Sequence, residues 1–270
     1  MPPKDDKIAK PDLTYSDSPG EELPALLKAV RARTPARLLA GRSGAAYRTS
    51  TQLELREAHA AARDAVRAEL NLLTAPLDDR GTDFGLRQKL FEVCSRAANK
   101  DEYLLRPELG RRLNDKSREE VIRRCSTRND LQIVIGDGLS VTAVTVQVPL
   151  LLPLLSDGAK KRGWSIGEIF VVRYCRVGIL NEIGELLVPA VAILLIGERP
   201  GLATAESLSA YMAYRPKTSD TDANRNLISN IHARGVGTTQ AVERLLNLAG
   251  SMMKTHKSGW QLREELPAAP

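Results

Sequence analysis

The sequence predicts an α/β protein in which a helical N-terminal region precedes a doubly wound, mostly parallel, Rossmann-like sheet. Apolar runs at 131–135 and 191–196 lead into the glycine-containing turns Gly136-Asp137-Gly138 and Gly197-Glu198-Arg199-Pro200-Gly201, as expected for strands buried on both faces. Strand and helix patterns alternate beyond residue 129. Aromatic residues make up only 4% of the chain, so the core must consist mainly of aliphatic side chains. Such a core suits a helix-rich or parallel-sheet protein better than a β-sandwich.

The chain is expected to comprise a disordered tail over 1–20, a helical region over 21–128 and an α/β domain over 129–270. The tail is rich in Lys, Asp, Pro and Ser, and its apolar residues are isolated. Two apolar stripes at helical spacing mark the helical region: Leu23, Leu26, Leu27 and Val30, then Ala58, Ala61, Ala62, Ala65 and Val66.

The elements of the α/β domain follow from the same patterns. We expect strands near 131–136, 168–174 and 190–196, helices from about 139 and near 177–187, extended segments around 208–214 and 226–231, and a terminal helix with Val242, Leu245, Leu246, Ala249 and Met253 on one face. Because ligands of open α/β sheets bind beyond the carboxyl ends of the strands, the two glycine-containing turns predict one shared crevice.

Composition excludes several classes of partner. Lys and Arg exceed Asp and Glu by 39 to 33, a net charge of +6, but Arg is spread along the chain without a dense basic block, so we expect no nucleic-acid partner. The most apolar stretch, 148–155, is interrupted by Pro149 and Pro153 and is too short to span a bilayer, and the N-terminus has no signal-peptide pattern. We therefore expect no membrane partner and a cytoplasmic location.

Loops after the expected strands carry polar side chains that suit either an anionic, amide-bearing ligand or structural ion pairs and helix caps. These residues are Asp137, Ser140, Arg173, Arg176, Glu198, Arg199, Arg225, Ser229 and Asn230. The dinucleotide-binding pattern G-x-G-x-x-G is incomplete, because Val141 occupies its last glycine position.

The sequence predicts no catalytic and no metal-ligating residue in this chain. No His lies beside a Ser or Cys in a nucleophile context, and Cys94, Cys125 and Cys175 form no C-x-x-C pair. His232 lies in Asn230-Ile231-His232-Ala233-Arg234-Gly235, close to the D-x-H-x-x-G element of one class of cobalamin proteins. Because Asn replaces the Asp that would orient a ligating imidazole, a hydrogen-bonded loop histidine is favoured over a cobalt ligand.

Six motifs occur together in a characteristic order. They are Arg106-Pro107-Glu108-Leu109-Gly110-Arg111-Arg112-Leu113, Ile135-Gly136-Asp137-Gly138-Leu139-Ser140, Phe170-Val171-Val172-Arg173-Tyr174-Cys175-Arg176-Val177, Gly197-Glu198-Arg199-Pro200-Gly201-Leu202, Glu206-Ser207-Leu208-Ser209 and Ile228-Ser229-Asn230-Ile231-His232. In sequence and spacing they closely resemble the small (light) subunit of ethanolamine ammonia-lyase, over residues from about 20 to the C-terminus.

The resemblance implies a lyase that depends on adenosylcobalamin (coenzyme B12) and converts ethanolamine to acetaldehyde and ammonia by radical chemistry. It implies a hetero-oligomer in which a large (heavy) subunit carries the catalytic groups and the small subunit helps to hold cobalamin at the interface. The location it implies is the cytoplasm, either free or within a bacterial microcompartment.

The family's cofactor contacts carry over to Val177, Glu198 and Leu227, where relatives have Cys at the third position. Asp137 and Arg199 are further candidates, inferred from their positions after strands rather than from the family. A free-standing cobalamin- or nucleotide-binding module without lyase activity is the alternative function. An α/β hydrolase is disfavoured because the sequence has no G-x-S-x-G element.

Overall fold

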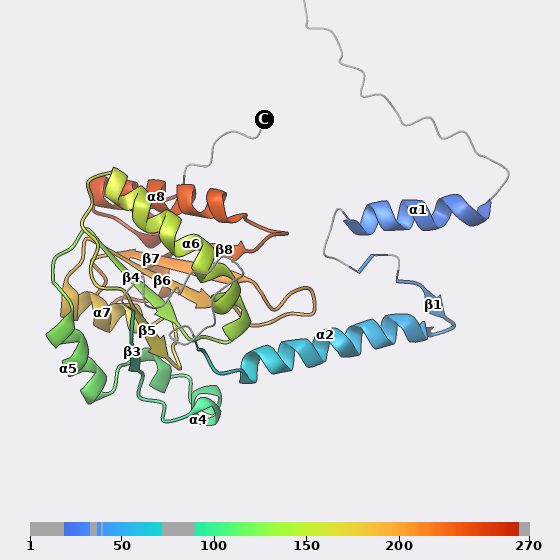
Figure 1. Cartoon of the computed structure of the whole chain (residues 1–270), viewed down its shortest axis with the longest axis horizontal. Helices are drawn as coiled ribbons and strands as arrows, with labels where there is room; N and C mark the ends of the chain where they lie inside the picture. Colours follow the sequence, from blue (N-terminus) through green and yellow to red (C-terminus); the bar gives the residue numbers. More distant parts are fainter. Residues whose placement is uncertain (1–18, 33–36, 39, 72–89, 265–270) are drawn as a thin grey trace, which may run out of the picture. The chain divides into compact units, whose positions relative to one another are not determined.

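The structure of the chain is a computed structural model that describes residues 19–32, 37–38, 40–71 and 90–264 (Figure 1). The chain divides into two compact units, residues 1–52 and 53–270. Of the tail expected over 1–20, residues 1–18 lie outside the described residues, and residues 19 and 20 begin a helix. The domain boundary expected at residue 128 stays a prediction.

The first unit contains α1, a short antiparallel hairpin and the start of α2. Their bounds are α1 (Pro19–Ala32), β1 (Arg42–Ser43), β2 (Ala46–Tyr47) and α2 (Thr49–Arg67), the last of which continues into the second unit. Side chains at two of the positions in the predicted α2 stripe, Ala62 and Ala65, are buried, whereas Leu26 of α1 is exposed.

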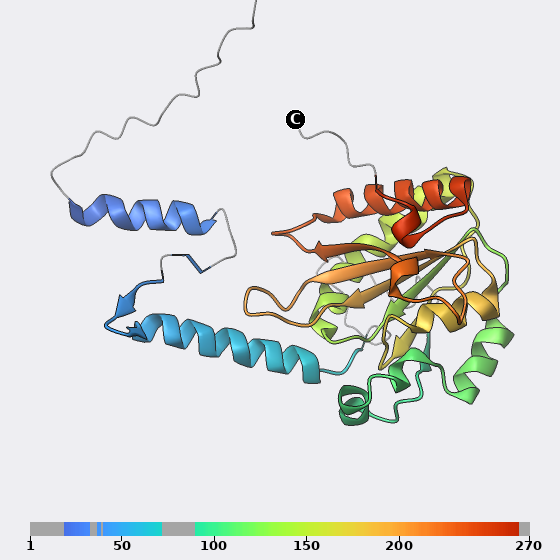
Figure 2. The same ribbon diagram turned by 180° about the vertical axis from the view of Figure 1, so that it is seen from behind.

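The second unit is built on a six-stranded sheet with helices on both faces (Figures 1 and 2). Its strands are β3 (Phe91–Cys94), β4 (Leu131–Gly136), β5 (Phe170–Arg173), β6 (Val191–Gly197), β7 (Leu208–Tyr214) and β8 (Asn226–Ile231). Its helices are α4 (Lys100–Leu105), α5 (Asp115–Arg124), α6 (Val141–Lys161), α7 (Ile179–Leu187) and α8 (Thr238–Thr255), with 3-10 turns η1 (Leu109–Arg111), η2 (Asp222–Asn224) and η3 (Gly259–Gln261).

The sheet order β3-β5-β4-β6-β7-β8 confirms the predicted α/β class with a mostly parallel sheet. Strands β3, β5, β4 and β6 pair in parallel, whereas β7 and β8 add antiparallel to the β6 edge. Helices connect the parallel strands, but no α-helix separates β6 from β7 or β7 from β8. Loops without a crossover helix suffice for antiparallel neighbours, which explains the change of direction.

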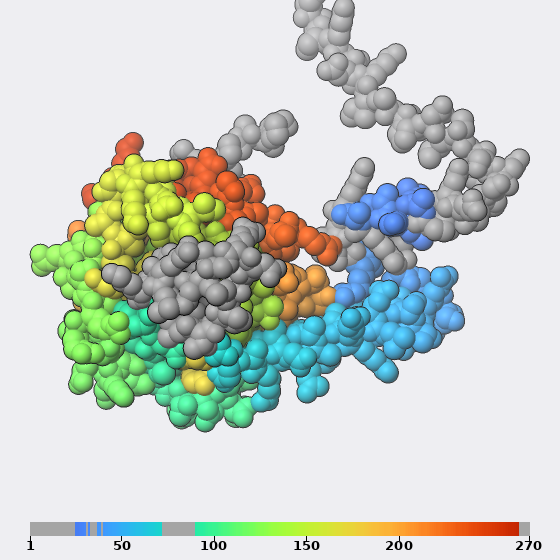
Figure 3. All heavy atoms as spheres, in the orientation of Figure 1, coloured from blue at the N-terminus to red at the C-terminus, as the bar shows by residue number. Residues whose placement is uncertain are grey.

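Alternate residues of β6 face opposite sides of the sheet, and all of them are buried, as predicted. Val191, Ile193 and Leu195 pack in a core with α6 and α8, and the residues between them pack in a second core that includes α7. Figure 3 shows the atoms of α6 and α8 lying against each other. Two cores on one sheet are the basis of the doubly wound architecture.

Helix α6 differs from the expectation of a short, interrupted apolar stretch. It is 21 residues long and continues past Pro149 and Pro153, so by length and composition alone it could cross a membrane. Half of its most apolar window is buried within the protein, where Val144, Val148 and Leu151 pack in the core shared with α8. Tertiary packing over several turns therefore compensates for the backbone hydrogen bonds that the prolines remove.

The region expected to be helical over 21–128 also contains a strand of the main sheet. Phe91–Cys94 form β3, an edge strand that pairs with β5, and its residues alternate between buried and half-buried. The rings of Phe91 and Phe170 lie 5.3 Å apart across this pairing. A four-residue alternation is too short to outweigh the helical patterns around it, and the strand forms because β5 offers it a partner.

Candidate functional site

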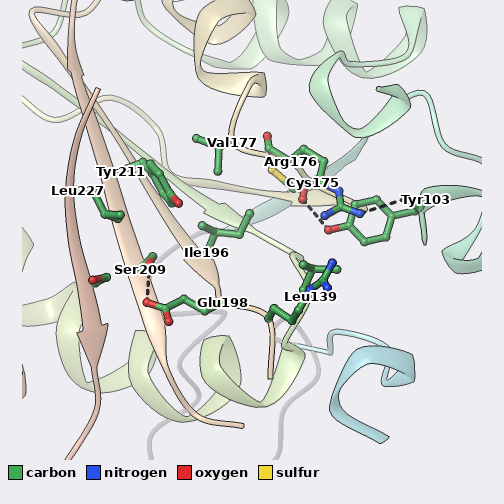
Figure 4. Close-up of a pocket in the computed structure, with 13 residues that line it drawn as sticks. Tyr103, Leu139, Cys175, Arg176, Val177, Ile196, Glu198, Ser209, Tyr211 and Leu227 are labelled. Carbon is green, nitrogen blue, oxygen red and sulfur yellow. Dashed lines mark hydrogen bonds between the residues drawn. The ribbon is translucent and has the colours of Figure 1, made fainter. Parts of the chain in front are cut away.

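A cavity of about 360 Å³ lies where the carboxyl ends of β4, β5 and β6 meet the antiparallel strands β7 and β8. Figure 4 shows Tyr211 and Leu227 on one side, Tyr103 and Arg176 on the other, and Ile196 between them. The lining comprises Tyr103, Leu139, Cys175, Arg176, Val177, Ile196, Gly197, Glu198, Arg199, Ser209, Tyr211, Leu227 and Ser229. Gly197, Glu198 and Arg199 of the second glycine-containing turn line this cavity, whereas the first turn contributes only Leu139, the residue that follows it.

The structure brings together the three residues expected to contact a cofactor. Val177, Glu198 and Leu227 come from the loop after β5, the end of β6 and strand β8, and all three line this cavity. Arg199 also lines it, whereas Asp137 does not. Leu227 is 44% exposed, so its side chain is available for apolar contact.

The Glu198 carboxylate links three segments at the cavity floor. Its Oε1 accepts hydrogen bonds from Ser209 Oγ at 2.6 Å and from the Asn230 backbone N–H at 2.9 Å, and its Oε2 accepts one from Ser207 Oγ at 2.9 Å. A carboxylate offers about four acceptor positions. One position on Oε2 therefore remains for a ligand that donates a hydrogen bond.

Close packing of backbone against backbone fixes the end of β6 where Glu198 begins. A Cβ atom on Gly197 would lie 1.9 Å from the Ser140 carbonyl oxygen, and the Gly197 carbonyl accepts a hydrogen bond from the Leu139 N–H at 3.3 Å. Only glycine allows this approach between β6 and the turn that precedes α6. The glycine therefore keeps the loops after β4 and β6 on the same cavity.

Tyr103 of α4 holds the opposite wall, which consists of the loop after β5. Its hydroxyl donates a hydrogen bond to the Cys175 carbonyl at 2.9 Å, and the Arg176 guanidinium lies 4.4 Å from the centre of its ring. Tyr103 is fully buried, and burial raises the pKa of its hydroxyl well above the usual range, so it stays a hydrogen-bond donor. The Arg176 N–H is fixed in turn by the Gly110 carbonyl at 2.8 Å.

Asp137 forms a buried ion pair behind this wall. Lys100 Nζ lies 2.8 Å from Asp137 Oδ1, and the two side chains are 8% and 0% exposed. Burial raises the pKa of the Asp137 carboxyl, and the ammonium of Lys100 opposes that rise. The Asp137 carbonyl also accepts a hydrogen bond from the Cys175 N–H at 2.7 Å, so the residue supports the cavity without lining it.

For several strand-end residues the structure favours the ion-pair and capping alternative. Arg173 pairs with Glu92 at 2.7 Å, Arg225 pairs with Asp222, and Ser140 caps α6. Arg176, Glu198, Arg199 and Ser229 instead line the cavity.

Both ring nitrogens of His232 are engaged within its own loop, as predicted for a hydrogen-bonded histidine. Nε2 lies 2.7 Å from Asn230 Oδ1, and Nδ1 accepts a hydrogen bond from the Arg234 N–H at 3.2 Å. Both ring nitrogens therefore have hydrogen-bond partners within the loop, which favours the hydrogen-bonded histidine over a cobalt ligand. The side chain is also 7% exposed.

Sequence reasoning missed Tyr103, Ser209 and Tyr211 in this cavity. Tyr103 lies 72 residues before Cys175 in the chain, within the region expected to be helical. Ser209 and Tyr211 alternate along β7, and this alternation could have placed them on one face of a strand near the end of β6.

Comparison with known proteins identifies the family to which this arrangement belongs. The family model described as Ethanolamine ammonia-lyase light chain (EutC) matches residues 25–263. The chain belongs to the ethanolamine ammonia-lyase light-chain family.

Individual relatives in this light-chain family support the assignment, and each is named "Ethanolamine ammonia-lyase small subunit". The Clostridium perfringens protein is 40% identical over 87% of this chain and 76% of its own length. The Clostridium acetobutylicum protein is 37% identical over 88% of this chain and 94% of its own length, and the Pseudomonas fluorescens protein is 38% identical over 94% and 88%. The resemblance read from the six motifs is thus confirmed.

Proposed function

We propose that this chain is the small subunit of an adenosylcobalamin-dependent ethanolamine ammonia-lyase. It would hold the cofactor at its interface with a catalytic large subunit. Family membership supports the role of a lyase subunit, and the relatives' name, small subunit, implies a larger partner in a hetero-oligomer. The observation that carries the cofactor assignment is the convergence of Val177, Glu198 and Leu227 on one cavity.

The residues around this cavity suit the edge of a corrinoid. Val177, Leu227 and Ile196 offer apolar surface for a macrocycle edge, and Glu198 retains an acceptor position for one of the amides that surround a corrin. A volume of about 360 Å³ is at the small end for a pocket that encloses a drug-sized ligand. Since a corrinoid is larger than such ligands, the cavity would hold only part of it, leaving the remainder to a partner.

The described side chains that line the cavity are suited to binding and positioning. Bound adenosylcobalamin would supply the radical chemistry that removes ammonia from ethanolamine. On this chain, Glu198 would accept a hydrogen bond, Val177 and Leu227 would exclude water from the ring edge, and Tyr103 would fix the loop that carries Val177. The leucine at 227 can make this contact through its methyl groups, without a thiol.

Reconstitution with the large subunit tests the proposal. The chain alone should release no acetaldehyde from ethanolamine, and the complex with the large subunit should do so when adenosylcobalamin is added. Absorbance titration should show cobalamin bound to the complex. Turnover by the chain alone would refute the division of labour, and cobalamin binding without activity in the complex would support the free-standing module instead.

We also propose that residues 21–70 contact the large subunit and that the enzyme occupies the cytoplasm or a bacterial microcompartment. Leu26 and Leu53 are 60% and 58% exposed, which leaves apolar surface on α1 and α2 for a partner. Hydrogen exchange in 21–70 should slow when the complex forms. Unchanged exchange there would assign the contact to another part of the chain.

A further inference from the structure

A cavity of about 460 Å³, here called the basic cavity, lies at the opposite end of the sheet from the proposed cofactor cavity. Its lining comprises Tyr214, Arg215, Lys217, Asp220, Asn224, His256, Lys257, Ser258 and Gln261. Tyr214 pairs with Val191 at the start of β6, whereas Gly197, at the end of β6, lines the cofactor cavity. The six residue steps from Val191 to Gly197 span about 20 Å at about 3.3 Å each. The two cavities share no lining residue, so the basic cavity is a separate feature.

Cationic side chains outnumber carboxylates in the lining of the basic cavity. Arg215, Lys217 and Lys257 face a single carboxylate among the described lining residues, that of Asp220. The three cationic side chains form no ion pair with any carboxylate in the described ranges. Asp220 Oδ2 already accepts a hydrogen bond from the Lys217 backbone N–H at 2.8 Å. The lining therefore carries a net positive charge that favours a bound anion.

The end of α8 accounts for only part of this positive charge. His256 and Lys257 follow the last turn of α8, where cationic groups offset the partial negative charge of the helix end. Arg215 and Lys217 come instead from the residues that follow β7, and they belong to no helix. Because these two residues converge with Lys257 on one cavity, a bound anion explains the set better than stabilisation of the helix does.

Close packing between η2 and η3 fixes one part of the cavity wall before any ligand binds. Ser258 Oγ donates a hydrogen bond to the Asn224 carbonyl at 2.8 Å, and both residues line the cavity. A Cβ on Gly259, whose φ is +64°, would lie 2.0 Å from the Ala223 carbonyl oxygen. Only glycine therefore allows η3 to approach η2 this closely. A wall formed in advance lowers the entropy that a ligand loses on binding.

Tyr214 holds two further side chains at the basic cavity. Its hydroxyl lies 2.5 Å from His256 Nδ1, and the Arg215 guanidinium lies 5.6 Å from the centre of its ring. Arg215 and His256 both adopt left-handed backbone conformations, with φ of +41° and +58°. Such conformations are uncommon for residues other than glycine, and they occur preferentially at ligand sites. The backbone and the side-chain contacts thus agree with a ligand site at this end of the sheet.

We propose that the basic cavity binds a small molecule that carries a diphosphate group. Its volume of about 460 Å³ lies within the range of small-molecule pockets and leaves room for more than a single phosphate. The guanidinium of Arg215 and the ammonium groups of Lys217 and Lys257 are suited to phosphate oxygens, and a diphosphate carries enough charge to engage several of them at once. Free pyrophosphate and the diphosphate of a nucleotide share this chemistry. The inference goes beyond the proposed function and does not depend on cobalamin.

Calorimetric titration of the full chain with orthophosphate, pyrophosphate and ADP tests this site. Pyrophosphate should bind about tenfold more tightly than orthophosphate, because it can contact more than one cationic side chain. Arg215→Gln, Lys217→Gln and Lys257→Gln should each weaken pyrophosphate binding about three- to tenfold, as expected for a charge-assisted contact that is partly solvated. Lys254→Gln removes an exposed lysine of α8 outside the cavity lining and should change this affinity less than about twofold. Without ligand, all four variants should unfold at the temperature of the unmodified chain, which separates loss of binding from loss of structure.

Titration with ADP identifies the source of the diphosphate. ADP that competes with pyrophosphate would extend the site to nucleotides, and exclusion of ADP would restrict it to free pyrophosphate; both results support a diphosphate site. The absence of saturable pyrophosphate binding, or an equal loss in Lys254→Gln, would overturn the proposal. Binding of polyglutamate without binding of pyrophosphate would assign the cavity to an acidic protein segment and would also overturn it.

Cobalamin titration of the complex with the large subunit, with and without pyrophosphate, tests whether the two cavities are separate. The cobalamin affinity should be unchanged by pyrophosphate, because the cavities lie at opposite ends of β6. Competition between the two ligands would place pyrophosphate at the cofactor cavity and overturn the separate site. A complex that binds pyrophosphate but no cobalamin would refute the proposed function and leave the diphosphate site intact.

Discussion

Glu198 offers the sharpest test of whether a residue at the cavity contacts cofactor or only supports the fold. Its carboxylate accepts three hydrogen bonds, from Ser207, Ser209 and the Asn230 N–H, at 2.6–2.9 Å. In Glu198→Ala all three acceptors disappear. A hydrogen bond to a charged group contributes about 1.5–3 kcal/mol, but Glu198 is only partly buried and water replaces part of the loss, so we expect the free energy of unfolding to fall by about 2–3 kcal/mol.

Glu198→Gln separates the two roles. The amide oxygen can accept from Ser209 and Asn230, and the new NH₂ can donate to Ser207 Oγ, because a hydroxyl can also accept. We therefore expect the free energy of unfolding to fall by less than about 1 kcal/mol. The free acceptor position on Oε2 is lost, however, so cobalamin affinity should fall by about 1–3 kcal/mol, or about 5- to 150-fold.

The assay is thermal or chemical unfolding of each variant chain, together with cobalamin titration of its complex with the large subunit. Glu206→Gln is the matched control, because Glu206 is an exposed carboxylate that lies outside the cavity lining. It should change neither quantity. Unchanged cobalamin affinity in Glu198→Gln, with reduced affinity only in the destabilised Glu198→Ala, would show that Glu198 supports the fold and makes no contact with the cofactor.

Two further predictions concern the support of the cavity. Lys100→Met should lower the free energy of unfolding by about 3–5 kcal/mol at neutral pH, because it leaves the buried Asp137 carboxylate unpaired, whereas Lys100→Arg should cost less. Burial raises the folded-state pKa of Asp137, and loss of Lys100 raises it further, so unfolding titrations should show the Met variant's deficit shrinking as the pH is lowered and this carboxyl becomes protonated. Gly197→Ala should lower the free energy of unfolding by at least about 2 kcal/mol, because the new Cβ would lie 1.9 Å from the Ser140 carbonyl oxygen. Gly201→Ala is the control, since the nearest atom to its Cβ lies at 4.0 Å, and it should lower the free energy of unfolding by less than about 1 kcal/mol. Equal losses of stability in the two variants would contradict the close approach of backbone at Gly197.

The sequence by itself determined the elements whose patterns are long or strongly apolar. The run at 191–196 and the run at 131–135 became adjacent parallel strands, with pairing from Leu131 opposite Val191 to Gly136 opposite Ile196. The glycine-containing turns after them located the cavity, because parallel strands bring their carboxyl ends to one edge. The resemblance of the six motifs predicted the family, and it predicted three cofactor-contacting residues, Val177, Glu198 and Leu227, which line a single cavity.

Tertiary structure alone decided the features that depend on distant partners. Strand β3 forms because β5 offers an edge, β7 and β8 run antiparallel because no crossover helix connects them, and Tyr103 reaches the cavity through a hydrogen bond to Cys175 across 72 residues. The same dependence made Asp137 the buried partner of Lys100 and placed the Arg176 guanidinium against the ring of Tyr103. Local pattern records which face of an element is apolar, whereas burial and charge pairing arise between elements, so only the folded chain determines them.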